Sequence, residues 1–132
     1  MTTLTQYLIG FLLAAHGWVH FVYVASSLGW FASESDWAWN GRSWLLSEVL
    51  EETQIRTFAN GLFLLVALGF VIGALGYVFA QNWWRPLLIA ASVLSTALYL
   101  LLWDGKATQL PEKGGLGILI NVAVIAWIVV LN

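Results

Sequence analysis

His16 and His20 are the residues of this chain whose type and spacing could carry chemistry. They stand four residues apart in the apolar stretch Ala15-His16-Gly17-Trp18-Val19-His20. In a helix, this spacing projects both imidazoles from one face, one turn apart. Ionisable side chains within a long apolar segment are costly and often mark function. We expect neutral imidazoles, because burial disfavours the charged form.

Three kinds of ligand chemistry fit such a pair. A helical zinc site uses two histidines at this spacing, but it also needs a third ligand and usually a glutamate. The chain has no further histidine, and the nearest suitable acid, Asp104, ends an apolar segment, so we predict no metal site. One histidine could instead ligate haem or a pigment, with help from a partner ligand. The pair could also relay protons or hydrogen-bond a quinone, so the cofactor stays open.

A structural interpretation competes with these three, and it is the one we favour. The histidines would then hydrogen-bond across the protein to Ser92, Ser95, Tyr99 or Asn121. Ser92, Ser95, Thr96 and Tyr99 share one helical face, and small hydroxyl side chains let helices approach closely. If a cofactor is bound at His16 and His20, then Asn121, Tyr99 and Ser95 are its further candidate contacts.

The composition indicates the environment of these groups. Of 132 residues, 61% are hydrophobic and 9% are charged, and the mean hydropathy is +0.83. An average soluble domain has about 25% charged residues, so this chain is expected to be an integral membrane protein. Its net charge of −2 favours no nucleic-acid partner. The absence of cysteine excludes disulfides and thiolate sites.

Four apolar segments can each cross about 30 Å of hydrocarbon as a helix. They cover residues 7–31, 58–79, 83–103 and 114–131. Their apolar runs are continuous and lack the alternation of membrane β-strands. We therefore predict one all-α domain over residues 1–132, an integral membrane four-helix bundle.

The first loop, residues 32–57, is long, acidic and rich in tryptophan. Within residues 43–53, Leu46, Val49 and Leu50 fall on one helical face, which predicts a short amphipathic helix in the membrane interface. A cap over the end of the bundle is the favoured role, and a surface that docks a partner or gates a substrate is the alternative.

Other residues are expected to anchor or pack the helices. Aromatic and charged side chains at the ends of the third segment should lie at the two membrane interfaces, and they are Trp83, Trp84, Arg85, Trp103 and Asp104. Gly69, Gly73 and Gly76 form a GxxxG-type face for close helix contact, either within the monomer or between copies.

Basic residues give an orientation. Arg42, Arg56, Lys106 and Lys113 lie in loops on one side of a four-span chain, and Arg85 alone lies on the other. Because basic residues are retained in the cytoplasm, the long first loop is expected there.

The order of features resembles that of small uncharacterised four-span bacterial membrane proteins. These features are the two histidines, Gly41-Arg42-Ser43-Trp44-Leu45-Leu46-Ser47, Trp83-Trp84-Arg85-Pro86, Trp103-Asp104 and Asn121. In size and span number the chain is similar to DoxX-like proteins, some of which accompany quinone-linked oxidoreductases. The resemblance implies a location in the bacterial plasma membrane.

No catalytic signature is present in the sequence, so we lean away from an enzyme. The leading hypothesis is a non-catalytic accessory or structural subunit, with the lipid bilayer and other membrane subunits or copies of itself as partners. The alternatives are a redox-linked protein holding a quinone, haem or pigment through His16 and His20, and a small oligomeric transporter or channel.

Overall fold

The computed structural model describes residues 3–30, 39, 41–108, 110 and 114–131. This part of the chain contains helices and no strand, which confirms the all-α prediction. The α-helices are α1 (Thr3–Ser27), α2 (Glu52–Val78), α3 (Trp84–Leu101) and α4 (Leu116–Leu131), and a single turn of 3-10 helix, η1, covers Leu46–Glu48.

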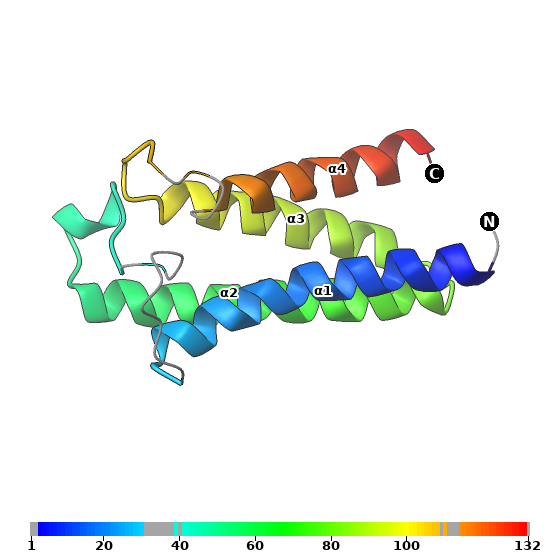
Figure 1. Ribbon diagram of the computed structural model, residues 1–132, viewed down its shortest axis with the longest axis horizontal. Helices are drawn as coiled ribbons and strands as arrows, with labels where there is room; N and C mark the ends of the chain where they lie inside the picture. The colour runs from blue at the N-terminus through cyan, green and yellow to red at the C-terminus, as the bar shows by residue number, and fades with distance from the viewer. Residues whose placement is uncertain (1–2, 31–38, 40, 109, 111–113, 132) are drawn as a thin grey trace.

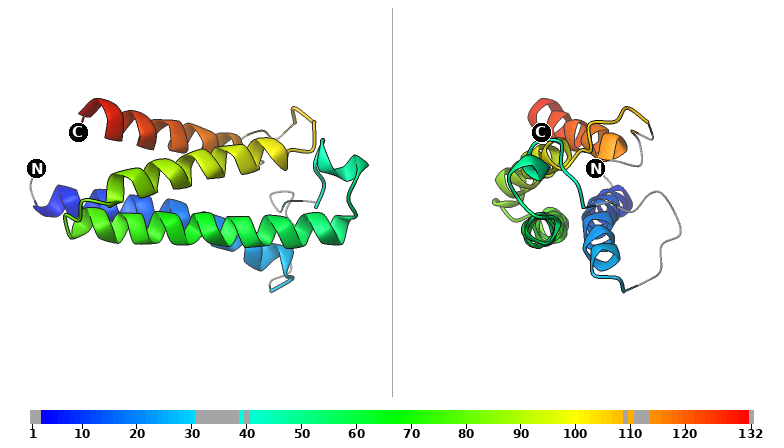
Figure 2. Two further views of the ribbon diagram at one scale, coloured as in Figure 1. Left: turned by 180° about the vertical axis from the view of Figure 1, so that it is seen from behind. Right: turned by 90° about the vertical axis from the view of Figure 1, so that its left-hand side faces the viewer.

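The helices run alternately up and down, so that each lies antiparallel to the one before it (Figure 1). α1 packs along α2, α2 along α3, and α3 along α4. The end of α1 near the N-terminus and the end of α4 near the C-terminus lie at the same end of the bundle, beside the α2–α3 turn (Figures 1 and 2). We call this the turn end, and the opposite one the loop end.

Three of the helices are long and apolar enough to cross a membrane, namely α1, α2 and α3. This finding fits an integral membrane protein. α4 is also apolar but shorter, with 16 residues.

Glycines allow the close approach of neighbouring helices. Gly69, Gly73 and Gly76 of α2 all face α3 within the same chain. A Cβ atom at Gly73 would lie 2.6 Å from Leu88, and one at Gly76 would lie 2.6 Å from the ring of Trp83. The GxxxG-type face is thus occupied inside the monomer.

The loop between α1 and α2 differs from the expected helix over residues 43–53. Residues 43–51 contain only the short η1, and α2 already begins at Glu52, before the expected start at residue 58. A capping box explains the early start, because the side chain of Glu51 accepts from the backbone of Gln54 and the amide of Glu51 donates to Gln54 Oε1 at 3.0 Å. Residues 31–38 and 40 of this loop lie outside the described residues.

The described part of this loop caps the C-terminus of α3. The last carbonyl groups of a helix have no partner within it. Here Trp44 Nε1 donates to the carbonyl of Leu100 at 2.8 Å, and the Ser43 hydroxyl donates to that of Leu101. Trp39 Nε1 donates to the carbonyl of Leu102 at 3.1 Å.

The backbone amide of Trp44 completes the cap by donating to the carbonyl of Trp103 at 2.8 Å. Four successive carbonyl groups therefore find donors from one short segment. The conformation of this segment is itself fixed by Ser43 and Ser47, since the amide of Ser43 donates to Ser47 Oγ at 3.0 Å and the amide of Ser47 donates to the carbonyl of Ser43 at 3.2 Å. These contacts favour the role of a cap over the bundle.

The expected interface anchors divide into buried and exposed residues. Trp83 is exposed, whereas Trp84 is buried against Tyr77 and Trp127 at the turn end. Arg85 is exposed and lies over the ring of Trp84. At the loop end, Trp103 Nε1 donates to the carbonyl of Lys106 at 3.0 Å, and Asp104 Oδ1 accepts from the amide of Lys106 at 3.0 Å.

Candidate functional site

His16 and His20 lie together inside the bundle. Both belong to the face of α1 that packs against the other helices, where His20 is fully buried and His16 is 7% exposed. Their ring centroids are 5.1 Å apart in an edge-to-face arrangement. The helical spacing of four residues thus brings two imidazoles into contact in the protein interior.

Both ring nitrogens of His20 have partners within the chain. Nδ1 lies 3.0 Å from the carbonyl oxygen of His16, one turn earlier in α1. Nε2 lies 2.7 Å from the hydroxyl oxygen of Ser95 in α3. His20 therefore links α1 to α3 and has no ring nitrogen left for another ligand.

Asn121 of α4 is fully buried and forms the second centre of the network. Its Oδ1 lies 2.9 Å from Nε2 of His16. Its Nδ2 donates to Ser95 Oγ at 2.9 Å and to Thr96 Oγ1 at 3.1 Å. Thr96 Oγ1 in turn donates to the carbonyl of Ser92 at 2.9 Å. One polar network thus joins α1, α3 and α4.

These contacts determine the proton positions when both imidazoles are neutral. A backbone carbonyl only accepts, so Nδ1 of His20 carries its proton and Nε2 accepts from the Ser95 hydroxyl. Ser95 then has only lone pairs left, so the amide nitrogen of Asn121 donates to it. Asn121 Oδ1 accepts, and Nε2 of His16 must carry the proton. The two histidines consequently hold opposite tautomers.

Aromatic rings surround the two imidazoles. Phe70 of α2 is fully buried, with its ring edge-on to His16 at a centroid distance of 4.7 Å and stacked on His20 at 5.8 Å. The ring centroid of Phe63 lies 6.0 Å from that of His20. In such apolar surroundings a satisfied hydrogen bond is strong, while an unpaired polar group is costly.

Tyr99, a predicted contact of the histidines, lies beside His20 through its ring, with 5.5 Å between the ring centroids. Gly114 and Gly117, at the start of the last helical segment, pack directly against the ring of Tyr99. A Cβ atom at Gly117 would lie 2.6 Å from Cε2 of Tyr99. Tyr99 therefore helps α4 to approach α3, and the hydrogen bonds to the histidines come from Ser95 and Asn121.

Ser92, the other hydroxyl candidate, is fully buried but makes no side-chain hydrogen bond within the described residues. The sequence pattern placed Ser92 and Ser95 on one face of α3, yet only Ser95 reaches the histidines. Sequence reasoning missed Phe70 altogether, because it is one of many apolar residues in a uniformly apolar helix.

The donor set is poor for a metal ion. Across the described ranges, no three side chains of His, Asp or Glu are close enough to bind a metal together. Of the four imidazole nitrogens, only Nδ1 of His16 lacks a hydrogen-bond partner in the described part of the chain. A haem or metal bound through both histidines would have to displace a partner of His20, either Ser95 or the carbonyl of His16.

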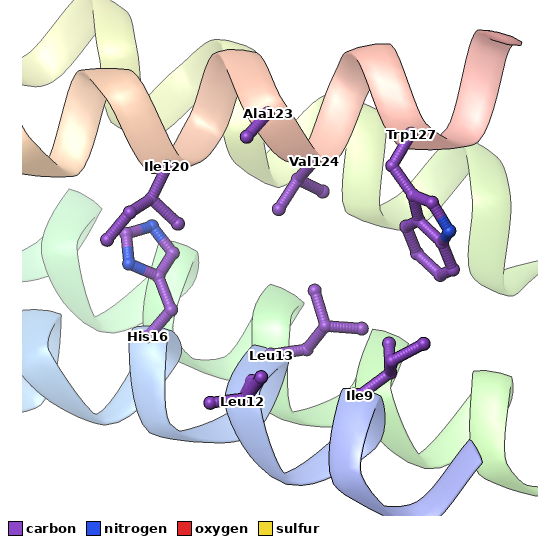
Figure 3. A pocket seen from close by; sticks show the side chains of 8 residues that line it. All are labelled: Ile9, Leu12, Leu13, His16, Ile120, Ala123, Val124 and Trp127. Carbon is purple, nitrogen blue, oxygen red and sulfur yellow. The ribbon is translucent and has the colours of Figure 1, made fainter. Parts of the chain in front are cut away.

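A groove separates α1 from α4 next to His16, as Figure 3 shows. It has a volume of about 240 Å³ and is open along one side. Apart from His16, its walls are apolar, and they are formed by Ile9, Leu12, Leu13, Ile120, Ala123, Val124 and Trp127. The groove exists because α4 follows α3 and touches α1 only sparsely.

Fold and site together define an all-helical, membrane-type bundle with a buried polar network. No model of a known protein family, no curated protein and no solved structure matches this chain.

Proposed function

We propose that this protein is a non-catalytic four-span membrane protein that serves as an accessory or structural subunit, within a larger membrane complex or as a homo-oligomer. The proposal is based on the hydrogen bonds that the two histidines make within the chain. Both nitrogens of His20, and the nitrogen of His16 that points to Asn121, are engaged inside the chain. Groups held in this way stabilise helix packing and are not free to react.

The fourth span is part of this proposal. α4 is apolar, lies antiparallel to α3, and is joined to it by Asn121 at a depth shared with the histidines. A 16-residue helix is about 24 Å long, and a modest thinning of the bilayer accommodates such a length. The polar network would then lie within the membrane, where an interhelical hydrogen bond contributes about 0.6 kcal/mol on average and at most about 1.7 kcal/mol.

The capping loop supports a structural role in the same way. Its tryptophans and Ser43 use their donors on the end of α3, which favours a fixed cap over a movable gate. We place this loop in the cytoplasm of a bacterial cell, on the distribution of basic residues and the resemblance described above.

The redox alternative makes a different demand on the site. A quinone, haem or pigment bound through both histidines requires that His20 gives up its contact with Ser95 or with the carbonyl of His16, leaving a buried group unpaired at a cost of about 1–3 kcal/mol. A transport function requires several copies, because aromatic and aliphatic side chains fill the interior of the described bundle.

Purification in mild detergent from native membranes, followed by an absorption spectrum and mass spectrometry, tests the proposal. The expected product is a colourless protein, without haem, pigment or quinone, that is recovered with other membrane subunits or as an oligomer. Turnover of a substrate by the purified chain alone would contradict it. So would a stoichiometric chromophore or quinone that is present in the wild type and lost in His16→Ala and His20→Ala.

A further inference from the structure

The groove between α1 and α4 ends at Trp127, whose ring contacts Trp84 next to Arg85 at the turn end. It extends from His16 to Trp127 (Figure 3). Trp127 stacks on Trp84 with 5.5 Å between the ring centroids, and the guanidinium carbon of Arg85 lies 5.3 Å from the centroid of Trp84. Two aromatic rings, Trp127 and Trp84, therefore connect the apolar groove to the cation of Arg85.

Among the described residues, no acidic side chain lies at the end of the bundle that carries Arg85. Arg56 pairs with Glu52 at the loop end. The other described acidic residues are Glu48 in η1, Glu51 just before α2 and Asp104 just after α3, and these segments lie at the loop end (Figure 1). The described residues of α1, α3, α4 and the turn between α2 and α3 contain none. An exposed arginine in this position complements an anion, and its planar fork fits a phosphate group.

We propose that this groove binds one acyl chain of an anionic glycerophospholipid, whose phosphate is held by Arg85. The inference rests on the proposed placement of α4 in the bilayer. The groove then lies at hydrocarbon depth and opens toward lipid, while Arg85 lies at headgroup level. Trp84 and Trp127, whose rings are amphipathic, separate the two regions and suit the level of the ester groups.

Charge distinguishes a phospholipid from a second copy of this chain as the occupant. The described residues of α1 and α4, which form the groove, include no acidic side chain, so the same face of a second copy would offer no anion to Arg85. A lipid phosphate supplies the anion that an exposed arginine complements.

The test is native mass spectrometry of the full chain in detergent after delipidation and addition of defined lipids. The probes are phosphatidylglycerol, diacylglycerol with the same acyl chains, and inorganic phosphate. The wild type is expected to retain one phosphatidylglycerol and to bind diacylglycerol and free phosphate at least about tenfold more weakly, which corresponds to about 1.4 kcal/mol. Equal binding of diacylglycerol would overturn the assignment of Arg85.

Two pairs of variants test the two halves of the site. Arg85→Gln should weaken the retention of phosphatidylglycerol about tenfold, whereas Lys106→Gln, which removes an exposed cation at the loop end, should leave it unchanged. Ala123→Phe fills the groove and should abolish retention. Ala126→Phe adds the same ring one turn nearer the turn end, at an exposed position outside the groove, and should not.

Unaltered retention in both Arg85→Gln and Ala123→Phe would overturn the inference, as would a quinone in the groove of the native protein. Labelling of single cysteines engineered into the first loop and after α4 determines independently whether α4 spans the membrane. The lipid result and the proposed function can therefore fail separately. A chain with four spans that retains no phospholipid contradicts the inference alone. A chain in which α4 does not span contradicts the proposed function as well.

Discussion

The hydroxyl oxygen of Ser95 lies 2.7 Å from Nε2 of His20, and both residues are fully buried between α1 and α3. The same oxygen accepts a hydrogen bond from Asn121 of α4 at 2.9 Å. The Ser95 hydroxyl oxygen thus contacts both α1 and α4 from its position on α3. If the histidines are structural, the consequences should be measurable as stability and helix placement.

Replacing Ser95 with alanine should destabilise the bundle. The change removes the donor to His20 and an acceptor of Asn121, so two buried groups lose a partner, and we expect a loss of about 1–3 kcal/mol. Reversible unfolding in mixed detergent and denaturant micelles measures this difference. Ser92→Ala is the matched control, since Ser92 is equally buried, lies one turn away and makes no side-chain hydrogen bond. Equal destabilisation by the two changes would contradict the network.

Asn121→Leu should loosen α4 from α1. Leucine has a similar volume but cannot bond His16, Ser95 or Thr96, and the contacts between α1 and α4 are otherwise sparse. Spin labels at the exposed positions Val19 and Val122 should show a longer and broader distance distribution in this variant. An unchanged distribution would mean that packing on α3 alone places α4.

Gly17→Ala tests the contact between α1 and α2 beside the histidines. A Cβ atom at this position would lie 2.7 Å from Cβ of Phe70 and 3.0 Å from the carbonyl oxygen of Ala67, so α1 must move away. We expect a loss of about 1–3 kcal/mol in unfolding free energy. Gly61→Ala serves as the control, because nothing lies within 4 Å of the added atom; there the stability should stay equal or rise. A neutral Gly17→Ala would show that the helices are less closely packed.

Trp44→Phe tests the capping loop. Phenylalanine keeps an aromatic ring but loses the Nε1 donor to the carbonyl of Leu100. Hydrogen exchange should accelerate at the last amides of α3 and stay unchanged at its first turn. Trp18→Phe is the control, since Trp18 is an exposed ring on the outer face of α1. Acceleration spread along the whole of α3 would point to general destabilisation and contradict a local cap.

Much of the fold can be predicted from the sequence because a membrane-spanning segment must satisfy its own backbone hydrogen bonds. Continuous apolar runs without the alternation of β-barrel strands therefore indicate helices. The start of α2 is not predicted correctly, because the residues from Glu52 to Thr57 are mostly polar and interrupt the apolar run. The helix nevertheless begins there, at the Glu51–Gln54 capping box. The expected helix over residues 43–53 is reduced to η1 because Ser43 and Trp44 turn their donors to the end of α3. That contact joins residues 56 or more positions apart, which no local pattern reveals.

The site too is predictable only in part. The spacing of His16 and His20 places them on one helical face, and the few polar residues in the other apolar segments are their expected partners. The choice of Ser95 over Ser92, and the role of Phe70, depend on how α1, α2 and α3 are rotated against one another. The groove depends on the distance of α4 from α1, and the near-uniform apolarity of α4 contains no sign of it.

The tautomers of the two histidines show whether the pair is held in the hydrogen-bonded network. Solid-state NMR of the protein in lipid bilayers, with ¹⁵N-labelled histidine and assignment by His16→Gln and His20→Gln, reports which ring nitrogen is protonated. The closed network requires two neutral rings of opposite kind, with the proton on Nε2 of His16 and on Nδ1 of His20. The same tautomer for both rings, or a charged imidazolium, would contradict the hydrogen-bonded, structural role of the pair.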